Sequence, residues 1–181
     1  MKTIKNKLLQ QNYAVEPVEY KDQNKYLRQI AYWVGYFIFE FNNLDDILTN
    51  ILGLHIGGGD IKIYEHIFLS GMSFNQKIEL LDRLYKYETT FINFESSDES
   101  PKEKIKKLIT ELKELGTLRN TIAHANYYSL DKNGNIKAKT KFADSDAEED
   151  WVAITRDFLV ESINRISKFT EKIEDFDNQF H

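Results

Sequence analysis

The chain contains no cysteine, which excludes disulfide bonds and thiolate chemistry from any account of its function. It also lacks a long apolar run, because its most apolar stretch, residues 30–39, is too short to span a bilayer and is followed by Glu40. The first residues hold lysines with no sustained apolar run behind them, which argues against a signal peptide. These absences favour a cytoplasmic protein.

An excess of positive charge is missing as well, since the formal net charge is −5. Five carboxylates gathered in residues 144–150 account for this value, so the remainder of the chain is formally neutral; they are Asp144, Asp146, Glu148, Glu149 and Asp150. This distribution excludes a broad electrostatic grip on nucleic acid through many phosphate contacts, but it leaves room for a local cationic pocket.

Metal and cofactor motifs are absent too. His55, His66 and His181 are isolated and lack the spacing of metal ligands. The acidic segment lacks the glycine and the terminal glutamate of a calcium-binding EF-hand loop. The glycine-rich stretch 53–60 lacks the lysine and hydroxyl residue of a phosphate-binding loop, so we interpret it as a connector. We therefore expect no metal and no cofactor.

What the sequence does contain is helical periodicity. The 181 residues, 41% of them hydrophobic, fit a single domain over 1–181. Apolar spacings of three and four predict a long first helix over 24–52, ended by Gly53, and a last helix over 155–176. We predict an all-α fold: an up-and-down bundle of four to five helices, the additional one being short and covering 61–69.

Local signals fix the remaining elements. Ser73 with Gln76, and Ser100 with Glu103, form two capping boxes that each predict the start of a helix. Asn133-Gly134 between two alternating runs predicts a β-hairpin insertion over 127–142, before the last helix. Residues 1–23 are polar and irregular, and we expect them to form an N-terminal arm.

The most informative feature is the hexapeptide RNTIAH at residues 119–124. It closes a helix whose apolar seam runs Ile105, Leu108, Leu112, Leu115 and then continues to Arg119 and Ile122. A guanidinium therefore occupies a position on the apolar seam, where a charge is costly unless something pairs with it. A phosphate site explains this placement better than an ordinary core does.

The groups in this hexapeptide suit cleavage of RNA without a metal. Neutral imidazole at His124 can take the proton of the 2′-hydroxyl, and the imidazolium can protonate the leaving 5′-oxygen. The Arg119 guanidinium can bind the phosphate through two parallel hydrogen bonds. Asn120 lies four residues before His124, on the same helix face, so it can orient the imidazole or donate to a phosphate oxygen.

With these residues the chain resembles the HEPN superfamily, named for higher-eukaryote and prokaryote nucleotide-binding domains. The family signature is an arginine, a polar residue, a few further residues and a histidine at the end of the third main helix of an all-α bundle. RNTIAH matches with four intervening residues, and Phe74-Asn75-Gln76-Lys77-Ile78-Glu79-Leu80-Leu81 has the look of the preceding helix. The resemblance covers roughly residues 24–176.

The resemblance implies a homodimer with a composite cleft, and a metal-independent endoribonuclease of toxin–antitoxin, abortive-infection or CRISPR-linked antiviral defence. It assigns Arg119 and His124 to the catalytic pair and Asn120 to the polar position. Some toxin members have a tyrosine two residues after the histidine, which a partner nucleotidyltransferase modifies. Here that position is Asn126, and the tyrosine follows at Tyr127. The resemblance therefore implies an antitoxin or nucleotidyltransferase partner, although the tyrosine that such a partner modifies is not at the expected position.

Several readings stay open at the level of sequence. Members of the family that have lost catalysis bind RNA, nucleotides or protein partners, and a purely structural dimerisation domain is a third reading. Arg119 can alternatively pair with an acid such as Glu40 while His124 favours the helix C-terminus. Tyr127 is a candidate for stacking on an RNA base, although strand positions more often serve packing. The lysines of residues 102–107 alternate with acids, which is typical of a solvated helix face. The alternative is that they line the rim of an RNA cleft.

Overall fold

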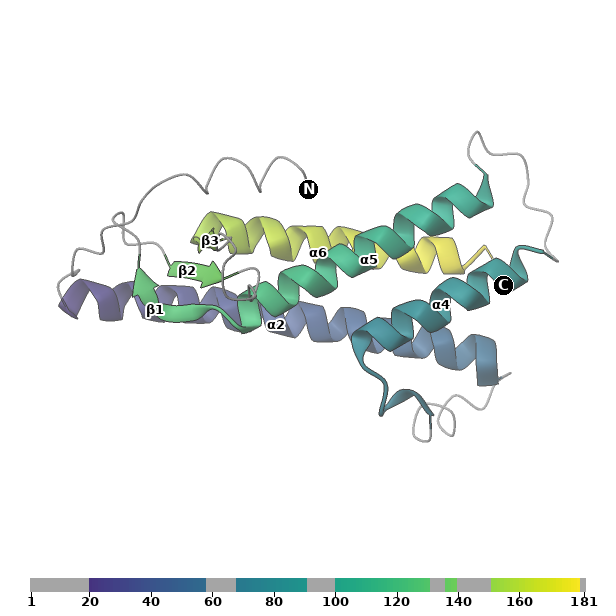
Figure 1. Ribbon diagram of the computed structural model, residues 1–181, viewed down its shortest axis with the longest axis horizontal. Helices are drawn as coiled ribbons and strands as arrows, with labels where there is room; N and C mark the ends of the chain where they lie inside the picture. Colours follow the sequence, from purple (N-terminus) through teal and green to yellow (C-terminus); the bar gives the residue numbers. More distant parts are fainter. Residues whose placement is uncertain (1–19, 58–67, 91–99, 131–135, 140–150, 180–181) are drawn as a thin grey trace, which may run out of the picture. The chain divides into compact units, whose positions relative to one another are not determined.

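A computed structural model describes the chain over residues 20–57, 68–90, 100–130, 136–139 and 151–179. Four helices account for most of these residues: α2 (Tyr20–Gly57), α4 (Phe74–Glu88), α5 (Pro101–Ala123) and α6 (Arg156–Asp177). Three short strands, β1 (Asn126–Leu130), β2 (Ile136–Lys139) and β3 (Trp151–Ile154), separate α5 from α6 in the sequence (Figure 1). The predicted all-α helical bundle is confirmed.

The residues group into two compact units. The first unit consists of Met1–Phe39 and Leu118–Asn164, and the second of Glu40–Thr117 and Arg165–His181. Helices α2, α5 and α6 are continuous, so each contributes one segment to each unit (Figure 1). The end of α5, with the hexapeptide at residues 119–124, belongs to the first unit.

The second unit is a bundle of four helical segments. Polar contacts align α2 with α4, because Lys77 donates to Asp45 at 2.8 Å near one end and His55 meets Glu88 at 2.7 Å near the other. These two helices therefore run in the same direction. The core consists of side chains at most 6% exposed: Phe41, Leu44, Leu48, Ile51, Leu52, Leu69, Ile78, Leu81, Tyr85, Ile105, Leu108, Ile109, Leu112, Leu115, Ile166, Phe169, Ile173 and Phe176.

The first helix is longer than its periodicity predicts. It begins at Tyr20 rather than residue 24, and it continues through Gly53 to Gly57, so the predicted stop at Gly53 was wrong. Glycine inside a helix costs only about 1 kcal/mol relative to alanine, which tertiary contacts can outweigh. Those contacts are present, because Leu52 is fully buried and His55 in the last turn is held by two carboxylates.

Both helix starts predicted from capping boxes are confirmed. The Ser73 hydroxyl accepts a hydrogen bond from the Gln76 amide at 3.4 Å, and the Gln76 side chain accepts one from the Ser73 amide at 2.8 Å. The Ser100 hydroxyl accepts from the Glu103 amide at 3.4 Å, and α5 starts at Pro101. These caps satisfy amide groups that the first helical turn leaves without partners.

Replacing Ser73 by alanine is expected to lower the free energy of unfolding by about 1 kcal/mol, because the hydroxyl that accepts from the Gln76 backbone amide is lost. The backbone amide of residue 73 can still donate to the Gln76 side chain, and nothing in the core changes. Urea unfolding followed by circular dichroism measures this loss. Replacing Ser73 by aspartate keeps an acceptor at the cap and should restore most of the stability. Equal stability of the alanine variant and the parent would show that this cap contributes nothing.

The first unit contains the predicted hairpin and one additional strand. β1 and β2 pair in antiparallel fashion, as the Asn-Gly turn predicts, and β3 pairs with β2 to complete a three-stranded sheet. Ile154, at the end of β3, is fully buried. We did not predict β3. Its aromatic and β-branched sequence, Trp151-Val152-Ala153-Ile154, is the signal that identifies it.

Some predictions fall on other parts of the chain. Of the arm predicted over residues 1–23, residues 1–19 lie outside the described part of the chain, and the last four residues belong to α2. The short helix predicted over 61–69 lies outside them except for Phe68 and Leu69. None of the helices that the structure describes combines the length and the apolar character needed to cross a membrane.

Candidate functional site

The hexapeptide at residues 119–124 occupies the last turn of α5, as predicted. Ala123 is the last residue of the helix, and the His124 amide still donates to the Asn120 carbonyl at 3.0 Å. The next amide, of Ala125, donates instead to the Ile122 carbonyl at 3.3 Å, which tightens the chain as the helix ends. The histidine is thus the first residue after the helix, on a backbone that is still hydrogen-bonded.

The apolar seam that leads to Arg119 is buried along its whole length. Ile105, Leu108, Leu112, Leu115 and Ile122 are each at most 2% exposed. Arg119, which interrupts this row, is half-buried. A positively charged side chain therefore lies on a helix face whose other members belong to the core, as the sequence predicts.

Arg119 uses one of its donors on its neighbour. Its Nη1 donates to Asn120 Oδ1 at 3.2 Å, which brings these two predicted site residues together. In the described part of its own unit, Arg119 forms no ion pair with a carboxylate. The guanidinium carries five N–H donors, so this single bond leaves it able to bind an anion.

His124 is exposed, like Asn120, and among the described residues its ring makes no hydrogen bond. The structure thus joins Arg119 to Asn120 and leaves the imidazole facing solvent. That Asn120 orients the His124 imidazole stays a prediction. In the structure its side-chain oxygen accepts a hydrogen bond from Arg119 instead. Tyr127 lies three residues beyond His124, in β1, and its side chain is outside the described residues.

A second cluster of ionisable groups, which the sequence did not reveal, lies in the second unit where α2, α4 and α6 end. His55 Nδ1 lies 2.7 Å from Glu88 Oε1, and His55 Nε2 lies 2.7 Å from Asp177 Oδ1. The Tyr85 hydroxyl also donates to Asp177 Oδ1, at 2.9 Å. The His55 side chain is only 3% exposed, so the arrangement is internal to the bundle.

Both ring nitrogens of His55 face carboxylate oxygens, which requires each nitrogen to donate a proton. Burial opposes the charged form, but the hydrogen bonds and charges of Asp177 and Glu88 outweigh it and raise the pKa of His55 above 6.5. Burial and the Asp177 carboxylate raise the pKa of Tyr85, whose hydroxyl therefore stays protonated and donates. With no ring nitrogen left over, this cluster is suited to hold three helix ends together rather than to act as a catalytic base.

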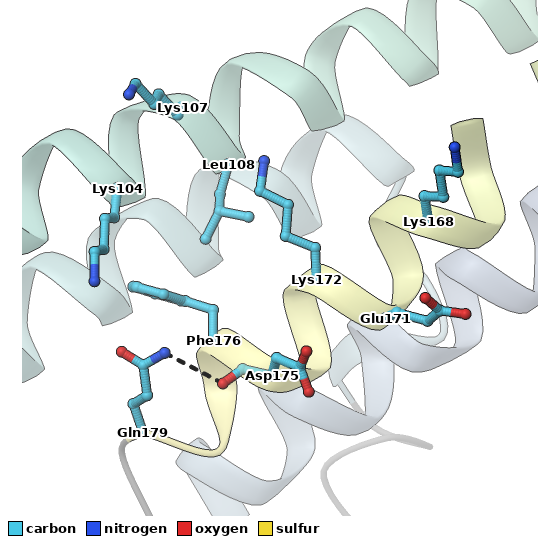
Figure 2. Close-up of a pocket in the computed structure, with 9 residues that line it drawn as sticks. All are labelled: Lys104, Lys107, Leu108, Lys168, Glu171, Lys172, Asp175, Phe176 and Gln179. Atoms are coloured by element: carbon cyan, nitrogen blue, oxygen red, sulfur yellow. Dashed lines mark hydrogen bonds between the residues drawn. The ribbon is translucent and has the colours of Figure 1, made fainter. Parts of the chain in front are cut away.

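An open groove of about 520 Å³ lies between α5 and α6 in the second unit (Figure 2). Its lining combines four lysines, two acids and an apolar floor: Lys104, Lys107, Leu108, Lys168, Glu171, Lys172, Asp175, Phe176 and Gln179. Lys172 is bound to Glu111 at 2.9 Å, and it lies over the Phe169 ring at 5.7 Å. Because acids neighbour the lysines on both helices, this groove fits the solvated helix face better than a phosphate site.

The described residues contain no group of three histidine, aspartate or glutamate side chains arranged to hold a metal ion. Comparison of the chain with protein-family models, with curated proteins and with solved structures found no match.

Proposed function

We propose that the chain is a metal-independent endoribonuclease of the HEPN type, acting as a cytoplasmic homodimer in defence or in a toxin–antitoxin pair. The observation that carries this proposal is Arg119, a half-buried cation on a buried apolar seam, followed by an exposed Asn120 and, four residues after Asn120, an exposed His124. The homodimer supplies two copies of the hexapeptide to one cleft, and light scattering at micromolar concentration measures its mass directly.

In the reaction, the ribose 2′-oxygen attacks the adjacent phosphorus while its proton passes to a neutral His124 imidazole. The bond from phosphorus to the 5′-oxygen then breaks, and an imidazolium returns a proton to that leaving oxygen. The products are a 2′,3′-cyclic phosphate and a 5′-hydroxyl. The Arg119 guanidinium stabilises the charge that develops on the non-bridging oxygens. Asn120, already bonded to Arg119, holds the guanidinium in place, and Tyr127 is the candidate for stacking on a base.

Replacing Arg119 by lysine tests the role of the guanidinium while keeping the positive charge. Lysine is a point charge and cannot make two parallel hydrogen bonds to a phosphate, so we expect kcat to fall by about a hundredfold. Cleavage of a fluorogenic RNA oligonucleotide measures this. Arg83→Lys is the matched control, because Arg83 is a 78% exposed arginine on α4, and it should leave kcat unchanged.

Two results would contradict this role for Arg119. Full activity of the lysine variant would show that only charge matters at this position. A loss of the same size in Arg83→Lys would show that the assay responds to general properties of the protein rather than to the site.

A further inference from the structure

The segment of α2 from residue 29 to residue 39 contains no charged side chain. Within it, Ile30 and Phe37 are buried in the core. Tyr32, Tyr36 and Phe39 are exposed by 67%, 41% and 66%, which is unusual for large rings in a single region of a soluble protein. A feature of this kind marks a surface that meets a partner.

The three exposed rings share one helix face. Arg28, Tyr32, Tyr36 and Phe39 follow one another at steps of four, four and three, which places them in one row along the helix. We call this row the outer face of α2. At about 100° per residue it lies on the side of the helix opposite to the core residues, so these rings cannot join the core of the first unit.

The outer face is also open beside Gly35. Gly35 lies on the same side of the helix, and a Cβ atom added to it would meet no atom within 4 Å. Gly35 has no side chain to cover the helix surface between Tyr32, three residues before it, and Phe39, four residues after it. The exposed rings therefore border free space into which a flat group can enter.

Two arginines accompany the rings among the described residues of the first unit. Arg28 is exposed at the start of the outer face. The Arg156 guanidinium lies 5.4 Å from the centre of the Trp33 ring, and that ring contacts Tyr32 at 5.2 Å in an edge-to-face arrangement. Exposed rings beside arginines are the combination with which proteins bind single-stranded nucleic acid, since the rings stack on bases and the arginines pair with phosphates.

From this combination we propose that the outer face of α2 is a stacking surface for single-stranded RNA. Tyr32 and Phe39 offer ring faces to successive bases, and Arg28 pairs with the phosphate backbone. This surface belongs to the first unit, which also holds residues 119–124. The inference rests on the proposed ribonuclease function for the identity of the ligand, and it adds a substrate-binding surface outside the hexapeptide.

The positive charge favours RNA over a second copy of the chain as the occupant. Interfaces between protein chains are also enriched in aromatic rings, but there a ring contributes mainly buried apolar contact area, part of which leucine keeps. Stacking on a base needs a planar ring. Substitution of a ring by leucine therefore separates the two occupants, because leucine keeps an apolar side chain but removes the flat surface.

The test uses the full chain carrying His124→Ala, so that the RNA is bound and not cut. Fluorescence anisotropy of a labelled oligoadenylate of about 12 nucleotides measures the affinity. We expect Tyr32→Leu and Phe39→Leu each to weaken binding about tenfold, while Tyr32→Phe binds like its parent. We also expect Arg28→Gln to reduce the slope of log affinity against log salt by about 0.7, the value for one phosphate contact with a single strand.

Three results would overturn the proposal: no binding of the oligoadenylate, unchanged affinity in both leucine variants, or a duplex of the same length bound as tightly as the single strand. A dimer that dissociates in Tyr32→Ala, with RNA affinity unchanged, would assign the surface to a second copy instead. The proposed function is tested separately by cleavage. If the rings bind RNA but the parent does not cleave it, the ribonuclease proposal fails and the stacking surface stands. If the parent cleaves RNA but the leucine variants bind it as tightly as their parent, the stacking surface fails and the ribonuclease proposal stands.

Discussion

Replacing His124 by alanine is expected to lower the rate of RNA cleavage by about a thousandfold, the usual contribution of a general acid–base residue. The physical reason is that no other side chain of residues 119–124 exchanges a proton near neutral pH. Guanidinium and carboxamide groups do not serve as proton acceptors or donors for acid–base catalysis in this range. Single-turnover cleavage of an RNA oligonucleotide measures the chemical step itself.

The stability of this variant should hardly change, because the His124 side chain is exposed and lies beyond the last residue of α5. Thermal unfolding provides that check. Lys113→Ala, which alters another exposed side chain of α5, is the matched control and should cut like the parent. An alanine variant at His124 that cuts as fast as the parent would remove the histidine from the mechanism.

Replacing His55 by alanine is expected to lower the free energy of unfolding by about 3–5 kcal/mol, the usual cost of removing one partner from a buried ion pair. The loss arises because Asp177, whose side chain is 7% exposed, would remain buried without its cation. Urea unfolding measures it. Lys86→Ala is the control, since Lys86 pairs with Asp82 on an exposed face of α4 and should contribute under 1 kcal/mol.

The contribution of His55 should also depend on pH. Because its folded-state pKa is raised above 6.5, protonation stabilises the folded chain fully below 6.5, and this stabilisation is lost as pH rises through the folded-state pKa. The difference in unfolding free energy between the parent and His55→Ala should thus be larger at about pH 6 than at about pH 9. A difference that grows with pH would contradict a charged His55.

The elements that the sequence predicted well are those specified by nearby residues. The start of α4 follows from Ser73 and Gln76, three positions apart, and the buried seam of α5 follows from a repeat of three and four. Both depend on contacts within one or two helical turns. The capped helix starts and the hairpin are therefore largely encoded locally.

The features that the sequence did not predict depend on distant residues. His55 meets Glu88 and Asp177 across separations of 33 and 122 residues, so its spacing in the sequence gives no sign of an ion cluster. The same contacts explain the error at Gly53, because they hold the helix together past a residue that usually ends one. β3 was missed for a similar reason, because its partner strand β2 lies on the other side of the acidic segment in the sequence.

For the candidate site, the sequence correctly indicated that Arg119 lies on a buried seam and that Asn120 and His124 come at the end of α5. It did not indicate the hydrogen bond between Arg119 and Asn120, because side-chain rotamers do not follow from helical periodicity. Nor did it direct attention to the outer face of α2, since the exposure of Tyr32 and Phe39 depends on which side of the helix packs against the core.

The most direct test of the central claim is the identity of the RNA ends produced by the purified parent in the presence of EDTA. We predict cleavage that EDTA does not inhibit, giving 2′,3′-cyclic phosphate and 5′-hydroxyl ends, with the same ends formed about a thousandfold more slowly by His124→Ala. Intact RNA, cleavage that requires a divalent metal, or products ending in a 3′-hydroxyl would contradict it.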